Sequence, residues 1–220
     1  MENTRQPTPR ELITTSITET LLEPLTQSGF IFSKSSLTFK KNSGDFTQTI
    51  TFQLNRYNET GISAEFRTIW SITSKAYSKW YKAKYGTKPL NDHLFTEPDW
   101  NIENWEFPFI NNKQEYYSQI IEETQRPEVL TMLKNNILTI GIPTLNHFSD
   151  WENAANNFLS KNSDHHKASD FFQLADNSEK SLQALQKGLD YWKQHPNASN
   201  PEDLEEIHKR LNNISKASSY

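Results

Sequence analysis

The chain has 220 residues, of which 34% are hydrophobic and 23% are charged, and its formal net charge is −4. It contains no cysteine, which excludes disulfides, thiolate catalysis and cysteine-ligated zinc or iron–sulfur sites. Its six glycines are widely spaced, the closest pair being Gly29 and Gly44, so the closely spaced glycines of phosphate-binding loops are absent. We expect no cofactor, no metal and no recognisable catalytic residue.

The first residues, MENTRQPTPREL, do not form a basic stretch followed by an apolar run, and no run of about 18 apolar residues occurs in the chain. These features predict a cytoplasmic protein that does not contact a membrane. At this length a chain can bury a sizeable core, and aromatic residues make up 12% of it. Folding therefore requires neither a metal nor a disulfide.

The first predicted element is a helix that begins after Thr8. Pro9 is at its first position and Glu11 completes a capping box with Thr8. Gly29 is expected to end this helix, and Pro24 predicts a kink or an earlier stop.

From residue 30 the apolar period changes to two, which indicates strands. Turn residues separate three segments, about 37–41, 46–57 and 62–72. We predict an antiparallel meander with one face on the core. The residues expected on that face are Phe46, Ile50, Phe52, Leu54, Ile62, Ala64, Phe66, Trp70 and Ile72.

Helices dominate the remainder of the prediction. A helix over 74–85 is capped by Ser74, and residues 86–111 read as a proline-containing aromatic connection with one short strand. Further helices are predicted over 113–124, 127–139 and 150–159, the last opened by Ser149 and Glu152, with a break at Gly141 and Pro143. A polar linker over 160–169 precedes two helices, 177–194 and 201–215.

The predicted fold class is therefore α+β, an antiparallel β-meander flanked by helices with a C-terminal helical extension. Residues 1–160 would form the α+β domain, and residues 161–220 a helical hairpin appended to it.

Three segments carry a family resemblance: LLEPLTQSGFIFSKSSLTFKK, TITFQLNRYN and GIPTLNHFSDWENAANNFL. Their order along residues 8–160 resembles a bacterial domain of unknown function, number 4304. The resemblance implies an α+β fold and a bacterial origin. It implies no catalytic residues.

Charge is distributed unevenly along the chain. Residues 29–90 contain ten lysines and arginines against three acidic residues, whereas residues 91–128 contain nine acidic residues against two basic ones. Either these neighbouring segments pack together, or they form a polar surface for a partner.

Few residues in the chain suggest chemistry. His165 and His166, flanked by Asp164 and Asp170, are the only histidine cluster, and we interpret them as part of the solvated linker because a metal site needs further ligands. The carboxylate pairs Glu122–Glu123 and Glu205–Glu206 are interpreted as exposed helix charges.

The outward face of the predicted meander is the best candidate for a partner-binding surface. Gln53, Glu65 and Arg67 lie on this face, and the connection that carries Trp100 and Trp105 is expected to fold nearby. Tryptophan and arginine are enriched at the energetic centres of protein interfaces.

Lys75, Lys79 and Lys82 line the outside of the helix over 74–85, between aromatic residues, which is an alternative candidate surface for nucleic acid. The acidic composition of the chain disfavours this alternative, so we do not expect nucleic acid to be the partner.

We therefore predict a non-enzymatic protein-binding module of a bacterial cytoplasm, with a protein partner. Its specific form would be an immunity protein that neutralises a cognate toxin. The alternatives are a nucleic-acid-binding protein that uses the basic segment 29–90, and an enzyme of unrecognised type.

Overall fold

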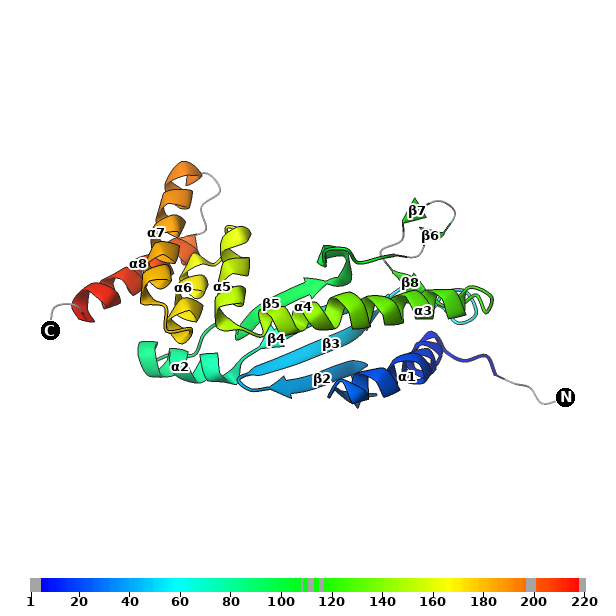
Figure 1. Cartoon of the computed structure of the whole chain (residues 1–220). Coiled ribbons are helices and arrows are strands. Elements are labelled where there is room, and N and C mark those ends of the chain that lie inside the picture. Colours follow the sequence, from blue (N-terminus) through cyan, green and yellow to red (C-terminus); the bar gives the residue numbers. More distant parts are fainter. Residues whose placement is uncertain (1–4, 108, 111–112, 115–116, 197–200, 218–220) are drawn as a thin grey trace. The chain divides into compact units, whose positions relative to one another are not determined.

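The computed structural model describes residues 5–107, 109–110, 113–114, 117–196 and 201–217, and it has an α+β fold (Figure 1). The chain divides into two compact units, Met1–Asn146 and His147–Tyr220. The division falls earlier than the boundary expected near residue 160, because the helix that follows Asp150 packs against the later helices. No helix in the described ranges combines the length and the apolar character that crossing a bilayer requires.

Helix α1 (Pro9–Gln27) begins as the sequence predicts. The Thr8 hydroxyl accepts a hydrogen bond from the Glu11 amide at 3.2 Å, and the Glu11 carboxylate accepts one from the Thr8 amide at 2.8 Å. The helix continues through Pro24 to Gln27, so the proline does not end it. Its buried apolar side chains are Ile13, Ile17, Leu21 and Leu25.

A six-stranded antiparallel sheet forms the centre of the N-terminal unit, with the strand order β1-β2-β3-β4-β5, and β8 also pairs with β4. The predicted meander is therefore present and is extended on both sides. The strands are β1 (Ile31–Ser33), β2 (Thr38–Ser43), β3 (Phe46–Leu54), β4 (Glu65–Thr73), β5 (His93–Pro98) and β8 (Ser118–Gln119).

One face of the sheet is buried. Along β4 buried residues alternate with half-buried ones, and Phe66, Trp70 and Ile72 are fully buried. Helix α1 contacts β4 and α3 (Arg126–Asn136), and α3 contacts β8, so these helices cover the apolar face. The prediction that Ile62 is a core strand residue is wrong, because β4 begins at Glu65 and Ile62 is 65% exposed in the preceding turn.

Helix α2 (Lys75–Tyr85) confirms the predicted helix: the Ser74 hydroxyl accepts from the Tyr77 amide at 3.2 Å. The helix predicted over 113–124 is wrong. Lys113–Gln114 is instead strand β7, paired with β6 (Phe109–Ile110), and β8 follows. Strand β5 pairs with β4 only from Ile69 onward, and β8 pairs with the first residues of β4. Residues 118–119 therefore form a strand because they pair with the backbone of β4.

The sequence predicts a break at Gly141 and Pro143, and this prediction is wrong. The helix that starts at α3 continues through both residues. It passes through a π-helical turn, η2 (Ile137–Gly141), into α4 (Ile142–Phe148). In this turn the Ile142 amide donates to the Ile137 carbonyl, and the wider turn lets the helix continue past Pro143, which has no amide hydrogen.

Gly141 lies directly against the indole of Trp70. A Cβ atom at this position would lie 2.2 Å from the nearest ring atom of that indole. The absence of a side chain at residue 141 therefore allows the helix to approach the sheet.

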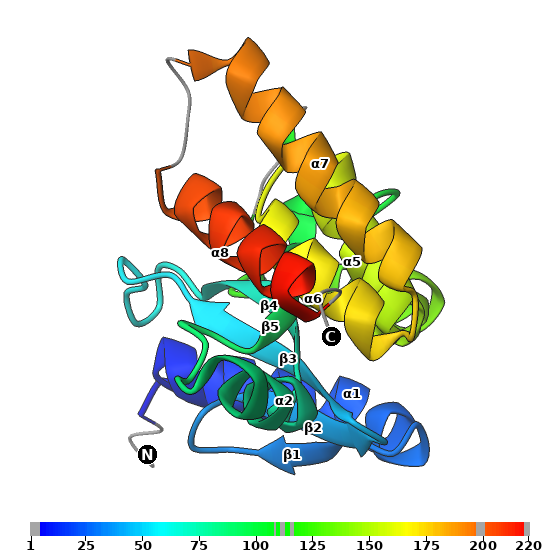
Figure 2. The same ribbon diagram turned by 90° about the vertical axis from the view of Figure 1, so that its left-hand side faces the viewer.

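The C-terminal unit contains α5 (Trp151–Ser160), α6 (His165–Leu174), α7 (Ser178–Gln194) and α8 (Pro201–Ala217) (Figure 2). Helix α6 contacts the other three, and α7 contacts α8. The cap of α5 is Asp150, whose carboxylate accepts from the Asn153 amide at 2.9 Å, and not Ser149. The linker predicted over 160–169 is wrong, because most of that segment from His165 onward belongs to α6 and is buried.

Candidate functional site

The outward face of the sheet is polar, as the alternation along β3 and β4 requires. Gln53 of β3 lies directly opposite Arg67 of β4, and Glu65 lies opposite Gln119 of β8. Most of the other outward side chains on β2, β3 and β4 carry hydroxyl or amide groups: Thr38, Asn42, Thr47, Thr49, Thr51, Ser71 and Thr73.

Arg67 is held in one position on this face. Its Nε donates to Gln53 Oε1 at 2.6 Å, and its guanidinium carbon lies 4.7 Å from the centre of the Trp100 ring and 5.4 Å from that of Tyr117. The structure thus brings together three of the predicted surface residues, Gln53, Arg67 and Trp100. Tyr117, which the sequence analysis did not single out, completes the cluster.

Asp99 explains why Trp100 lies beside Arg67. This buried carboxylate accepts hydrogen bonds from the Thr68 amide at 2.7 Å, the Thr68 hydroxyl at 3.0 Å and the Trp100 amide at 3.0 Å. Burial raises the pKa of Asp99, and the hydrogen bonds and the nearby Arg67 charge oppose that effect. Asp99 therefore ties the short helical turn η1 (Asp99–Asn101) to β4 and positions the Trp100 ring.

Trp105 does not belong to this surface. Only 9% of it is exposed, and its ring packs edge-on against Trp70 with 5.4 Å between the ring centres. Trp105 is therefore a core residue, because the connection after η1 folds back over the sheet's apolar side. Its assignment to a partner-binding surface does not fit this burial.

The turn between β3 and β4 presents two exposed apolar side chains, Tyr57 at 72% and Ile62 at 65%. Its backbone is fixed by Asn58, whose side chain donates to the Glu65 carbonyl at 2.8 Å and accepts from the Glu65 amide at 2.8 Å. The Glu65 carboxylate accepts from Asn55. Glu65, which was predicted for the partner-binding surface, therefore makes the hydrogen bonds that hold the β3–β4 turn.

The lysines of the alternative nucleic-acid surface, Lys75, Lys79 and Lys82, are all exposed on α2. The aromatic residues between them contact one another, however: Tyr77 and Tyr81 are buried, with ring centres 5.7 Å apart. Rings that are used for packing within the protein cannot stack on bases.

The C-terminal unit contains a buried polar cluster that the sequence analysis missed. Asp203 accepts from His165 Nδ1 at 3.1 Å, from Trp192 Nε1 at 2.8 Å and from His166 Nδ1. Burial would raise the pKa of Asp203, but the hydrogen bonds from His165, His166 and Trp192 outweigh it and hold the pKa well below the usual range. The interpretation of His165 and His166 as a solvated linker is wrong.

An ion pair also joins α6 and α8. Arg210 Nε donates to Asp170 Oδ1 at 2.9 Å and Nη2 donates to Asp170 Oδ2 at 2.7 Å, and both side chains are buried. Arg210 Nη1 also contacts the Glu206 carboxylate. Because His165, Asp170, Asp203 and Arg210 are all buried, these two clusters are structural contacts that a substrate cannot reach.

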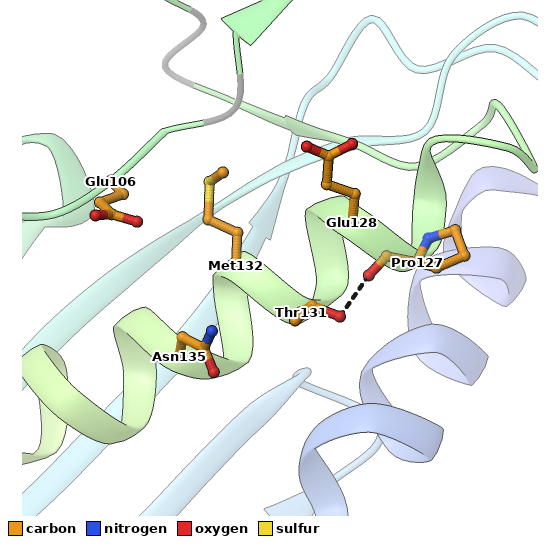
Figure 3. A pocket seen from close by; sticks show the side chains of 6 residues that line it. All are labelled: Glu106, Pro127, Glu128, Thr131, Met132 and Asn135. Atoms are coloured by element: carbon orange, nitrogen blue, oxygen red, sulfur yellow. Dashed lines mark hydrogen bonds between the residues drawn. The ribbon is translucent and has the colours of Figure 1, made fainter.

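A hollow of about 400 Å³ lies beside α3. In the view of Figure 3, Met132 lies between the carboxylates of Glu106 and Glu128. The Thr131 hydroxyl is already used, because it donates to the Pro127 carbonyl at 2.7 Å. The lining residues are Glu106, Pro127, Glu128, Thr131, Met132 and Asn135. Within the part of the chain that the structure describes, no three histidine or carboxylate side chains come together as metal ligands would.

No family model, no curated protein and no solved structure matches this chain. The resemblance to the bacterial domain of unknown function 4304 therefore stays a prediction from sequence motifs.

Proposed function

We propose that this chain is a non-enzymatic protein-binding module. Its binding surface, here called the Arg67 surface, consists of Tyr57, Ile62, Arg67, Trp100 and Tyr117. The observation that carries the proposal is that Arg67 bonds to Gln53 and lies over the rings of Trp100 and Tyr117, and that the turn joining its strand to β3 exposes Tyr57 and Ile62.

The composition of this surface supports protein binding. Tyrosine, tryptophan and arginine are the residue types most enriched among side chains that dominate binding energy. A single exposed apolar side chain is ordinary, but here two occur in the turn that joins the strands of Gln53 and Arg67.

Contacts within the protein already hold Arg67 and the backbone of the turn. Gln53 and the two rings hold Arg67, and Asn55, Asn58 and Glu65 hold the turn. Ordering of side chains and loops opposes association, so groups that are already fixed lose less entropy when a partner binds.

The specific form that we propose is an immunity protein of a bacterial cytoplasm that neutralises a cognate toxin. This form rests on the small, acidic, cysteine-free sequence and on the resemblance noted above. Co-expression with the product of a neighbouring gene tests it, because the chain should protect the host cell and a Tyr57→Ser, Ile62→Ser variant should not. Equal protection by that variant would contradict the proposed surface.

Binding itself is tested by affinity purification of the full chain from its native cell. The wild type should retain one protein in stoichiometric amount, and the Tyr57→Ser, Ile62→Ser variant should lose it. Leu90→Ser is the matched control, because Leu90 is 97% exposed and lies in a different loop, after α2. Failure of the wild type to retain any stoichiometric protein, or equal loss in the control, would refute the proposal.

A further inference from the structure

The guanidinium of Arg67 is only partly satisfied by the protein. Its Nε–H donates to Gln53, and its guanidinium carbon lies over the rings of Trp100 and Tyr117. The terminal nitrogens, Nη1 and Nη2, have no hydrogen-bond partner among the described residues. Arginine carries five donors in a planar fork, so the end of the fork is left for a ligand.

We propose that Arg67 is the receptor for a carboxylate side chain, an aspartate or glutamate, of the partner protein. A carboxylate is planar and accepts two parallel hydrogen bonds from the end of a guanidinium. This inference rests on the proposed function and adds to it the chemistry of the partner residue that binds at Arg67.

The aromatic rings occupy part of the space around the cation. The Arg67 guanidinium lies over the rings of Trp100 and Tyr117, a cation–π arrangement that stabilises its position. Because Nε is already bonded to Gln53, rotation of the guanidinium would break that bond. The fork is therefore directed before the partner arrives, and less rotational freedom is lost on binding.

The local charge favours a singly charged ligand over a phosphate or a nucleic acid. Glu65 lies two residues from Arg67 on the same strand face, and the buried Asp99 lies close enough for the Arg67 charge to act on its pKa. One cation with two carboxylates nearby does not attract a polyanion, which binds where several cations gather. A single carboxylate needs only the one fork.

The experiment uses two probes of nearly the same shape and different charge. They are Nα-acetylglutamate and Nα-acetylglutamine, each with its α-carboxyl group converted to an amide, so that only the glutamate probe has a free side-chain carboxylate. Each is titrated into the ¹⁵N-labelled full chain while the Arg67 Nε–H and Trp100 indole N–H resonances are followed. The glutamate probe should shift both resonances to a plateau, and the glutamine probe should leave them in place. Equal responses to the two probes would overturn the proposal, as would saturable binding of inorganic phosphate without binding of the glutamate probe.

Two variants locate the contact. Arg67→Lys keeps the charge but loses the fork, so the Trp100 resonance should report binding at least about tenfold weaker, the loss expected from one charge-assisted contact. Lys40→Gln removes a positive charge from an exposed position on the same sheet face and should bind the probe as the wild type does. Wild-type affinity in Arg67→Lys would refute the assignment.

The outcomes separate this inference from the proposed function. If the glutamate probe binds at Arg67 but no protein partner is recovered, the carboxylate site stands and the protein-binding proposal fails. If a partner is recovered and Arg67→Lys binds it as tightly as the wild type, the protein-binding proposal stands and the carboxylate site fails.

Discussion

Replacement of Gly141 by alanine should destabilise the N-terminal unit. The new Cβ would lie 2.2, 2.5 and 2.7 Å from three ring atoms of Trp70. Carbon atoms in contact are normally at least about 3.5 Å apart, so the nearest contact is too short by about 1.3 Å. The indole cannot simply move away, because Trp105 packs against it and its Nε1 donates to the Thr68 hydroxyl at 2.8 Å.

The net effect follows from two opposing terms. Overpacking of a core costs about 1–3 kcal/mol, and a close contact with three ring atoms belongs near the upper end of that range. Alanine is better than glycine in a helix interior by about 1 kcal/mol. We therefore expect Gly141→Ala to lower the free energy of unfolding by about 2 kcal/mol.

Urea unfolding followed by tryptophan fluorescence measures this change, with Asn135→Ala as a control at an exposed position of α3. The control should change stability by less than about 0.5 kcal/mol. In a Trp70→Leu background the Gly141→Ala step should become neutral or stabilising, because the clash is gone. An equal or greater stability of Gly141→Ala in the wild-type background would show that helix propensity dominates and that the described contact does not restrict residue 141.

Two further predictions concern the C-terminal unit, both measured by urea unfolding. Arg210→Ala should lower the free energy of unfolding by about 3–5 kcal/mol, because it leaves the buried Asp170 carboxylate without the Arg210 cation. The Asp170→Leu, Arg210→Met double variant should recover most of that loss. A double variant as unstable as the single one would contradict the reasoning. The pKa of Asp203 is lower in the folded than in the unfolded chain, so its stabilising contribution is complete above its unfolded pKa of about 3.9 and is lost as the pH falls below that value. The free energy of unfolding of Asp203→Asn should therefore fall less between pH 6 and pH 3 than that of the wild type, and parallel pH profiles would refute the assignment.

Local signals predicted those elements whose determinants lie within a few residues of one another. The capping box of Thr8 and Glu11 and the Ser74 cap define the starts of α1 and α2, and both form as expected. The meander was predicted from the period of two along β3 and β4. This signal is also local, because side chains that alternate along a strand point alternately toward and away from the core.

The wrong predictions concern residues whose structure depends on a partner far away in the sequence. Residues 118–119 form a strand because the start of β4 needs a backbone partner, and His165 is buried because Asp203, 38 residues later, accepts its hydrogen bond. Trp105 lies in a connection without regular period, so its burial leaves no pattern in the sequence.

The candidate surface was predicted in part. Gln53 and Arg67 follow from strand alternation, and the structure places Trp100 beside them. Tyr117 and the exposed side chains of the turn were not predicted, because a residue's place in a turn decides its exposure more than its type does. The contribution of Asp99 depends on a hydrogen bond to a residue 31 positions earlier, which no local pattern reveals.

The two polar contacts between α6 and α8, His165 with Asp203 and Asp170 with Arg210, also determine the alignment of those helices. Asp203, Ile207 and Arg210 recur at helical spacing on one face of α8, with the apolar residue between the two charged ones. An apolar stripe alone would let one helix slide along another by a turn, about 5.4 Å, at modest cost. With a carboxylate near the start of the stripe and a guanidinium further along it, such a slip would separate both charges from their partners at once, so α8 has a single favourable register on α6.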